Sequence, residues 1–172
     1  MDFRILPIPI SEVEPLMDLP IQDLADRGCK LIVADSKPGY PCRVSLQDAE
    51  IGEQIILMPY HHHATYSSYR SSGPVFIRVG ATQADLGINE IPVSVSSRLL
   101  SVRGYDVSGD MLDAEVTEGK NLRETISVLF ANSSVSYLHI HNAKPGCYSC
   151  KVVIALIGSI EISGAYLSKC RN

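Results

Sequence analysis

The sequence predicts an α+β fold, with a largely antiparallel sheet, one main helix at about residues 121–131 and short helices near the N-terminus. Most apolar segments are short and rich in β-branched residues, which is typical of strands. Strands and helices do not alternate regularly, as they would in a parallel sheet. The chain has 172 residues and no linker or low-complexity stretch, so we expect residues 1–172 to form a single globular domain.

The N-terminal part of the chain predicts one strand followed by two short helices. Residues 2–8 alternate like a strand, and two prolines within and after them suit a sheet edge. Ser11 and Glu14 have the spacing of a capping box, which predicts a helix starting there. Asp18 is a suitable cap for a second helix, and Gly28 is a suitable residue to follow its end.

The central and C-terminal parts supply the strands of the predicted sheet. A polar stretch, residues 61–73, separates two of these segments and is expected to be a loop. A Ser-Gly-Asp turn at residues 108–110 is typical of a hairpin. The expected strands are residues 30–35, 54–60, 74–79, 98–107, 111–116, 135–141 and 151–157.

The main helix is predicted by its cap and its apolar period. Asn121 is a good N-cap residue, and an acidic residue three positions later completes a capping-box pattern. The apolar residues then recur at helical spacing, so one face of the helix should pack on the sheet. These residues are Leu122, Ile126, Leu129 and Phe130.

Composition excludes several classes of protein. Hydrophobic residues make up 45% of the chain and charged residues 20%, which is the balance of a globular protein rather than a disordered one. The net charge of −4 argues against a broad nucleic-acid surface, so we expect no nucleic-acid partner. No apolar stretch is long enough to span a bilayer, so we expect no membrane association. Composition leaves homo-oligomerisation open.

The start of the chain and its cysteines favour a cytoplasmic location. Arg4, Pro7 and Pro9 interrupt what would have to be the apolar segment of a secretory signal. The five cysteines are odd in number and unevenly spaced, unlike a secreted disulfide framework. We therefore expect free thiols, a catalytic thiol or a metal site in a reducing compartment.

The segment that ends the predicted strand 135–141 carries the clearest chemical signal. The two-residue period of a strand puts His139 and His141 on one face, roughly 6–7 Å apart, and Leu138 and Ile140 on the opposite, core-facing side. A Lys-Pro-Gly turn follows and brings Cys147 back toward the end of the strand. The two imidazoles are close enough to share a ligand.

Three interpretations of this segment stay open. In the first, His139, His141, Cys147 and Cys150 bind zinc, which is the one cofactor these residues suggest. In the second, Cys147 or Cys42 is a thiolate nucleophile and one of the histidines is its base. In the third, both histidines are hydrogen-bonded and inert.

The polar stretch between two predicted strands offers a second group of candidates. Its three consecutive histidines, 61–63, are expected to be solvated, because neighbouring residues of an extended segment do not all face one ion. Tyr66, Tyr69 and Arg70 follow, and they could form a recognition loop for a planar or anionic ligand.

Three separated motifs resemble a bacterial family known as domain of unknown function 1203. They are PGYPCR at residues 38–43, a YRSSGPVF segment at 69–76 and HIHNAKPGCY at 139–148. The resemblance runs from about residue 3 to about residue 153 and leaves the C-terminal tail, 156–172, uncovered. Cys150 and the triple histidine are outside the family's pattern. The resemblance implies no activity, but it directs attention to the residues of the three motifs.

Our leading hypothesis from the sequence is a small enzyme that acts on a small anionic molecule through a cysteine–histidine pocket. It requires Cys42 and the 139–147 segment to converge in one pocket. The alternatives are a non-catalytic ligand- or zinc-binding domain and a module that binds a partner through the histidine face. The catalytic candidates are Cys42, His139, His141, Asn142 and Cys147, and the substrate-binding candidates are Tyr40, Arg43, Tyr69 and Arg70.

Overall fold

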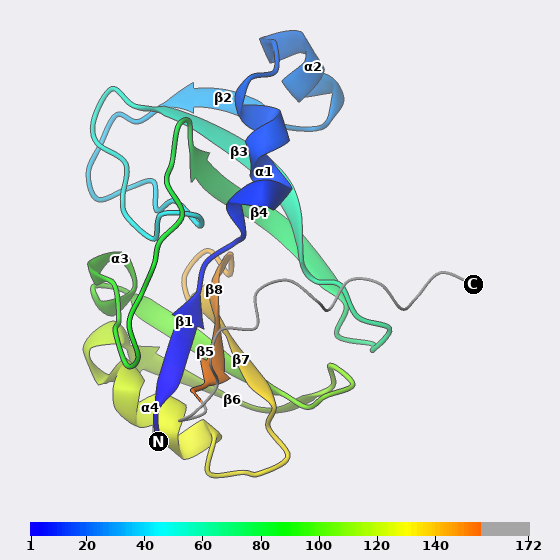
Figure 1. The fold of residues 1–172 in the computed structure, drawn as a ribbon, viewed down its shortest axis with the longest axis vertical. Coiled ribbons are helices and arrows are strands. Elements are labelled where there is room, and N and C mark those ends of the chain that lie inside the picture. Colours follow the sequence, from blue (N-terminus) through cyan, green and yellow to red (C-terminus); the bar gives the residue numbers. More distant parts are fainter. Residues whose placement is uncertain (156–172) are drawn as a thin grey trace.

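The computed structural model describes residues 1–155, which form two antiparallel sheets with helices at the outer side of each (Figure 1). The larger sheet has the strand order β1-β8-β7-β5-β6, and the smaller has the order β2-β3-β4. The predicted tail, 156–172, lies outside the described residues. The strands are β1 (Phe3–Leu6), β2 (Lys30–Val33), β3 (Gln54–His63), β4 (Ser71–Arg78), β5 (Leu99–Tyr105), β6 (Met111–Glu118), β7 (Tyr137–Asn142) and β8 (Tyr148–Ile154).

The main helix covers one face of the larger sheet, as the apolar period predicts. Helix α4 (Leu122–Leu129) follows directly after a 3-10 turn, η1 (Gly119–Asn121), and lies below β5 in Figure 1. The four residues of the predicted apolar face, Leu122, Ile126, Leu129 and Phe130, are all buried against the sheet. Leu138 and Ile140 of β7 are buried in the same core, which confirms the predicted two-sided pattern of that strand. The α+β prediction is therefore confirmed.

The short N-terminal helices are present, but they begin at residues other than those predicted. Helix α1 (Ile10–Met17) begins after Pro9, so Ser11 lies inside it and caps nothing. The exposed N–H of Ile10 instead donates to the side chain of Gln83, 2.8 Å away, and this tertiary partner replaces a local cap. Helix α2 (Ile21–Asp26) begins after a proline, while Asp18 ends α1. The short helix α3 (Val93–Ser96) lies just before β5 in the chain.

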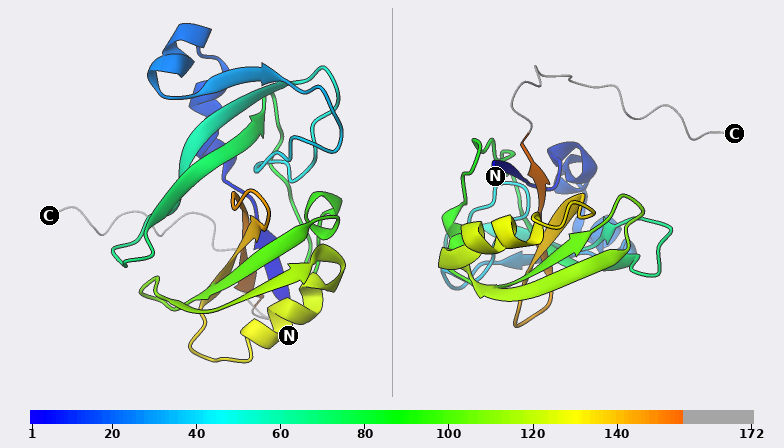
Figure 2. Two further views of the ribbon diagram at one scale, coloured as in Figure 1. Left: turned by 180° about the vertical axis from the view of Figure 1, so that it is seen from behind. Right: turned by 90° about the horizontal axis from the view of Figure 1, so that it is seen from below.

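The first strand ties the two sheets together. β1 pairs with β8 at the edge of the larger sheet, as the prolines predict. The chain then leaves that sheet, and the N–H of Ile8 donates to the carbonyl of Arg43, 2.9 Å away. Ile8 is buried in the core of the smaller sheet. The views of Figure 2 show this N-terminal segment running from one sheet to the other.

Strand β3 is longer than the sequence predicts. All three histidines, 61–63, belong to it, so the expected solvated loop is wrong for these residues. Strand β4 begins at Ser71 and pairs with His63 across a register shift, which extends the hairpin past Tyr60. The extension carries β3 over β7 and β8. Within residues 1–155, no helix combines the length and the apolar character needed to cross a bilayer.

Truncating the buried face of α4 tests the packing of the main helix. Ile126→Ala should lower the free energy of unfolding by about 2–5 kcal/mol, because Ile126 is 1% exposed and its loss leaves a cavity. Val128→Ala, on the exposed face of the same helix, should change it by less than about 0.5 kcal/mol. Urea denaturation measures both values. Equal losses in the two variants would contradict the packing described here.

Candidate metal centre and neighbouring thiol site

Three histidines meet where the end of β3 crosses β7 and β8. His62 comes from β3, and His139 and His141 come from one face of β7. One ring nitrogen from each lies within 4.8 Å of the others, and in the described part of the chain no other group of three histidine, cysteine or carboxylate ligands is so close. The sequence predicts the pairing of the last two histidines, but not the third.

Each of these rings has a buried nitrogen without a hydrogen-bond partner. The atoms are Nδ1 of His62, Nδ1 of His139 and Nε2 of His141. His139 and His141 are 3% and 1% exposed, so their rings are shielded from bulk water. An unsatisfied buried polar group costs roughly 1–3 kcal/mol, so a ligand that contacts all three nitrogens would stabilise the cluster.

Burial keeps the three imidazoles neutral. It lowers the pKa of His62 to about 4, that of His139 to about 2 and that of His141 to about 3. Desolvation is the largest cause for each ring, and neighbouring positive charge adds to it. A neutral imidazole has a lone pair on one nitrogen, which is the form that binds a metal ion.

A tight turn fixes the orientation of His141. The turn between β7 and β8 contains Gly146 with a φ of 74°, a conformation that favours glycine. The Nδ1–H of His141 donates to the Gly146 carbonyl, 3.0 Å away, so the lone pair is on Nε2. Hydrogen bonds of this kind, from the second ring nitrogen to a carbonyl, orient many metal-bound histidines. On the other side of the cluster, the ring of Tyr148 stacks on His62 with a centroid distance of 5.0 Å.

His63 differs from its neighbour because both of its ring nitrogens are in use. Nδ1 lies 2.9 Å from the carbonyl oxygen of Tyr69, and Nε2 lies 2.9 Å from the hydroxyl of Tyr137. A neutral ring satisfies both contacts by donating to the carbonyl and accepting from the hydroxyl. His61 is exposed. Of the three consecutive histidines, one is therefore solvated, one is structural and one joins the cluster.

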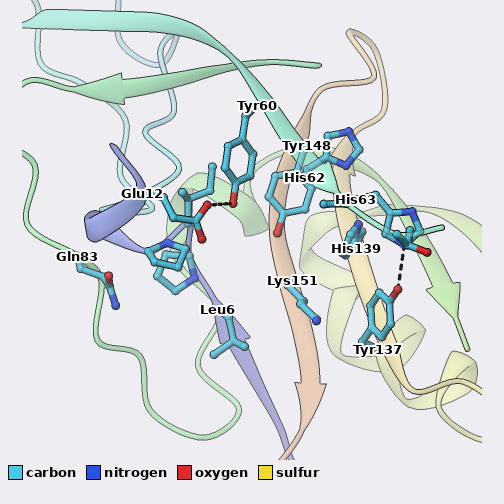
Figure 3. Close-up of a pocket in the computed structure, with 15 residues that line it drawn as sticks. Leu6, Glu12, Tyr60, His62, His63, Gln83, Tyr137, His139, Tyr148 and Lys151 are labelled. Atoms are coloured by element: carbon cyan, nitrogen blue, oxygen red, sulfur yellow. Dashed lines mark hydrogen bonds between the residues drawn. The ribbon is translucent and has the colours of Figure 1, made fainter. Parts of the chain in front are cut away.

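A cavity of about 440 Å³ opens beside the histidine cluster (Figure 3). His62 and His139 line it, together with Tyr148 and Lys151 of β8. On the α1 side of the cavity, the hydroxyl of Tyr60 donates to Glu12 at 2.8 Å. The histidine cluster is therefore accessible to a small molecule from one side.

Cys147 lies at a second cavity, with a volume of about 650 Å³. A guanidinium N–H of Arg43 donates to its sulfur at 3.0 Å, and the side-chain amide of Asn142 donates to it at 3.4 Å. The polar groups within hydrogen-bond distance of this sulfur in residues 1–155 are thus a guanidinium and an amide, rather than an imidazole. The structure brings together three of the sequence candidates, Arg43, Asn142 and Cys147, on this side of the β7–β8 turn.

Arg43 is 1% exposed and is satisfied mainly by main-chain carbonyls. Its Nε donates to the carbonyl of Tyr148 at 2.8 Å, and a terminal nitrogen donates to the carbonyl of Pro41. Burial lowers the pKa of the Arg43 guanidinium, and the nearby Cys147 acts in the opposite direction. In residues 1–155, the ion pairs join other residues, so no carboxylate balances the charge of Arg43.

The other two predicted cysteines lie in the cores. Cys42 is 1% exposed, and its sulfur accepts the N–H groups of Ser45 and Arg78 at 3.5 and 3.3 Å. Cys42 lines neither of the two cavities described above. Its neighbour Arg43, rather than Cys42 itself, shares a cavity with Cys147. Cys150 is packed with Leu138 and Ile140 on the core side of the larger sheet, away from the histidines, so the predicted set of two histidines and two cysteines does not assemble. Burial raises the pKa of Cys150 to about 12.

The remaining substrate-binding candidates lie outside both cavities. Tyr40 packs against Phe76, and its hydroxyl donates to Asp35 at 2.9 Å. Tyr69 and Arg70 are exposed in the turn between β3 and β4, where the carbonyl of Tyr69 contacts His63. The structure therefore does not bring these three residues together with Arg43.

Residues 39–153 match the family described as protein of unknown function (DUF1203). The chain belongs to this family. The match confirms the resemblance seen in the sequence, although residues 3–38 lie outside the matched region. The matched region of this DUF1203 protein includes the three clustered histidines as well as Cys147 and Arg43. No curated protein and no solved structure shows significant similarity to the chain.

The neutral imidazoles should make the metal-free protein less stable in acid. Histidines of the unfolded chain titrate near pH 6.5, whereas burial lowers the pKa of His139 to about 2 and of His141 to about 3. Below pH 6.5 the unfolded chain therefore binds protons that the folded chain does not. The stability present above pH 6.5 is lost as the pH falls, by up to about 1.4 kcal/mol per pH unit for each histidine.

Urea denaturation in chelator, at about pH 7.5 and about pH 5, measures this dependence. The double variant His139→Gln/His141→Gln should show a shallower dependence on pH, because two of the titrating groups are absent. His61→Gln is the control, since His61 is exposed. A double variant with the same dependence as the unaltered protein would show that these imidazoles do not cause the acid sensitivity.

Proposed function

We propose that this protein is a metal-dependent enzyme for a small polar molecule, with one divalent ion of the zinc class held by His62, His139 and His141. The observation that carries the proposal is the set of three buried ring nitrogens without hydrogen-bond partners. A single ion would satisfy all three rings at once. The zinc class fits because neutral imidazoles are among its preferred ligands.

The spacing of the rings supports the same proposal. Nitrogens bound to one zinc ion at 2.0–2.1 Å in a tetrahedron lie roughly 3.4 Å apart. The three rings offer nitrogens within 4.8 Å of one another before any ion draws them together. His141 is already oriented by the Gly146 carbonyl, and His62 by its stacking on Tyr148, so modest ring rotations would close the site.

An enzymatic role is supported by the open side of the cluster. Structural zinc sites are closed by four protein ligands, whereas catalytic sites use three and leave one position for water or substrate. Three histidines converge here, and two of them line the 440 Å³ cavity. An ion with an open position can polarise a carbonyl or activate a water molecule for attack.

We also infer a cytoplasmic location. Residues 1–155 contain four cysteines, and all four are free thiols. Free thiols are typical of proteins in reducing compartments.

Thiol chemistry at Cys147 is a second candidate function, and the charge of Arg43 favours it. The buried guanidinium has no carboxylate partner within residues 1–155, so a Cys147 thiolate would be its counter-charge. Asn142 donates to the same sulfur. The sulfur would add to a carbonyl carbon of a small molecule bound in the 650 Å³ cavity, and the electron pair of the C=O π bond would move to the carbonyl oxygen. Lys144 and Arg43 line the same cavity and favour an anionic substrate.

Zinc binding tests the first proposal. Chelator-treated, tag-free protein should bind one zinc ion per chain in isothermal titration calorimetry, and elemental analysis should find the same ratio. His62→Gln, His139→Gln and His141→Gln should each weaken binding by about 100-fold or more, because each removes a ligand. His61→Gln should bind zinc like the unaltered protein, since His61 is exposed on the same strand. Equal zinc affinity in all four variants would overturn the proposal.

Alkylation of Cys147 tests the second candidate. In a Cys170→Ser background, iodoacetamide at neutral pH should label Cys147 first, because the other three described cysteines are buried. Asn142→Ala should slow this labelling several-fold, because it removes a donor that stabilises negative charge on the sulfur. Asn121→Ala is the control, since that side chain caps no N–H group of its helix. Peptide mass spectrometry measures the rates, and an Asn142→Ala rate equal to the control would contradict the assigned role.

A further inference from the structure

We propose that the cavity beside the histidine cluster binds a carboxylate group, with one oxygen on the metal ion and the other on Lys151. The inference rests on the proposed function, because it requires the ion. It adds the chemical class of the substrate, which the ion alone does not define.

The pairing of β7 with β8 places Lys151 beside the cluster. Lys151 is the direct cross-strand partner of His139, and both residues line the same cavity. Cross-strand partners in an antiparallel pair have Cβ atoms only about 4.5–5.5 Å apart. A ligand bound at His139 would therefore lie within reach of the ammonium group.

Among residues 1–155, the ammonium group of Lys151 contacts an aromatic ring and has no anionic partner. Its Nζ lies 4.2 Å from the centroid of the Tyr137 ring, a cation–π contact that directs the half-buried side chain along the cavity wall. Figure 3 shows Lys151 on the histidine side of the cavity and Glu12 on the α1 side. In residues 1–155, Lys151 forms no ion pair and donates no side-chain hydrogen bond, so its three N–H donors are available.

The charge of the loaded site would favour an anion. Histidine binds an ion as a neutral imidazole, so three histidine ligands leave the two positive charges of a divalent ion uncompensated. Lys151 adds a third positive charge to the same side of the cavity. Glu12 also lines the cavity, but its carboxylate already accepts a hydrogen bond from the hydroxyl of Tyr60. A carboxylate fits this arrangement because its two oxygens can bind an ion and an ammonium at the same time.

Cobalt-loaded protein tests the inference, with acetate as the probe. Cobalt(II) takes the place of zinc, and its visible spectrum reports a change in the ligands of the ion. Acetate should change this spectrum in a saturable way. In Lys151→Met, which keeps the length of the side chain and removes its charge, the apparent Kd for acetate should rise about tenfold or more. Lys151→Arg should stay close to the unaltered protein.

Two controls separate the possible failures. Lys120→Met removes an exposed lysine that lines neither cavity and should leave acetate binding unchanged. Cobalt affinity and thermal stability, measured on every variant, show whether the metal site and the fold are intact. Failure of the unaltered protein to bind cobalt would overturn the proposed function itself. Normal cobalt binding without any acetate binding would overturn the inferred carboxylate site and leave the proposed function standing. Equal acetate affinity in Lys151→Met and the unaltered protein would overturn the role of Lys151.

Discussion

The buried guanidinium of Arg43 joins the two sheets, and both candidate sites depend on that junction. The main chain of Arg43 accepts a hydrogen bond from the N–H of Ile8 and donates one to the carbonyl of Phe76 in β4. The guanidinium of Arg43 donates to the carbonyl of Tyr148 in β8. A desolvated guanidinium requires these acceptors, because an unsatisfied buried charge is very costly. The main chain at Tyr148 is thereby fixed, with the ring of Tyr148 against His62 and the sulfur of Cys147 against Arg43.

Sequence patterns predict those parts of the fold in which neighbouring residues act together. The apolar period of α4 and the alternation along β7 are local properties, and both are found in the structure. The same alternation predicts the shared face of His139 and His141. Helix starts are less predictable where a distant group replaces the cap, as Gln83 does for Ile10.

The rest of the site depends on contacts between distant segments. Membership of His62 in the cluster requires β3 to continue past Tyr60, and a register shift with β4 allows this. Three histidines in a row give no sign of it, because a strand directs neighbouring side chains to opposite sides. The available signal was that residues 54–63 and 71–78 can pair as one long hairpin, which places the histidines at the end of a strand. The position of Arg43 opposite Cys147 likewise follows only from the packing of one sheet on the other.

The histidine cluster draws on both sheets, since His62 belongs to the smaller one and His139 and His141 to the larger. An ion bound there would act as a cross-link between segments far apart in the chain, closing a long loop in a protein whose described cysteines form no disulfide. In the unfolded chain His62 lies far along the sequence from His139 and His141, so the three ligands do not meet at one ion. Metal supply would then govern how long the protein survives in a cell, because the metal-free form would open more often to proteases.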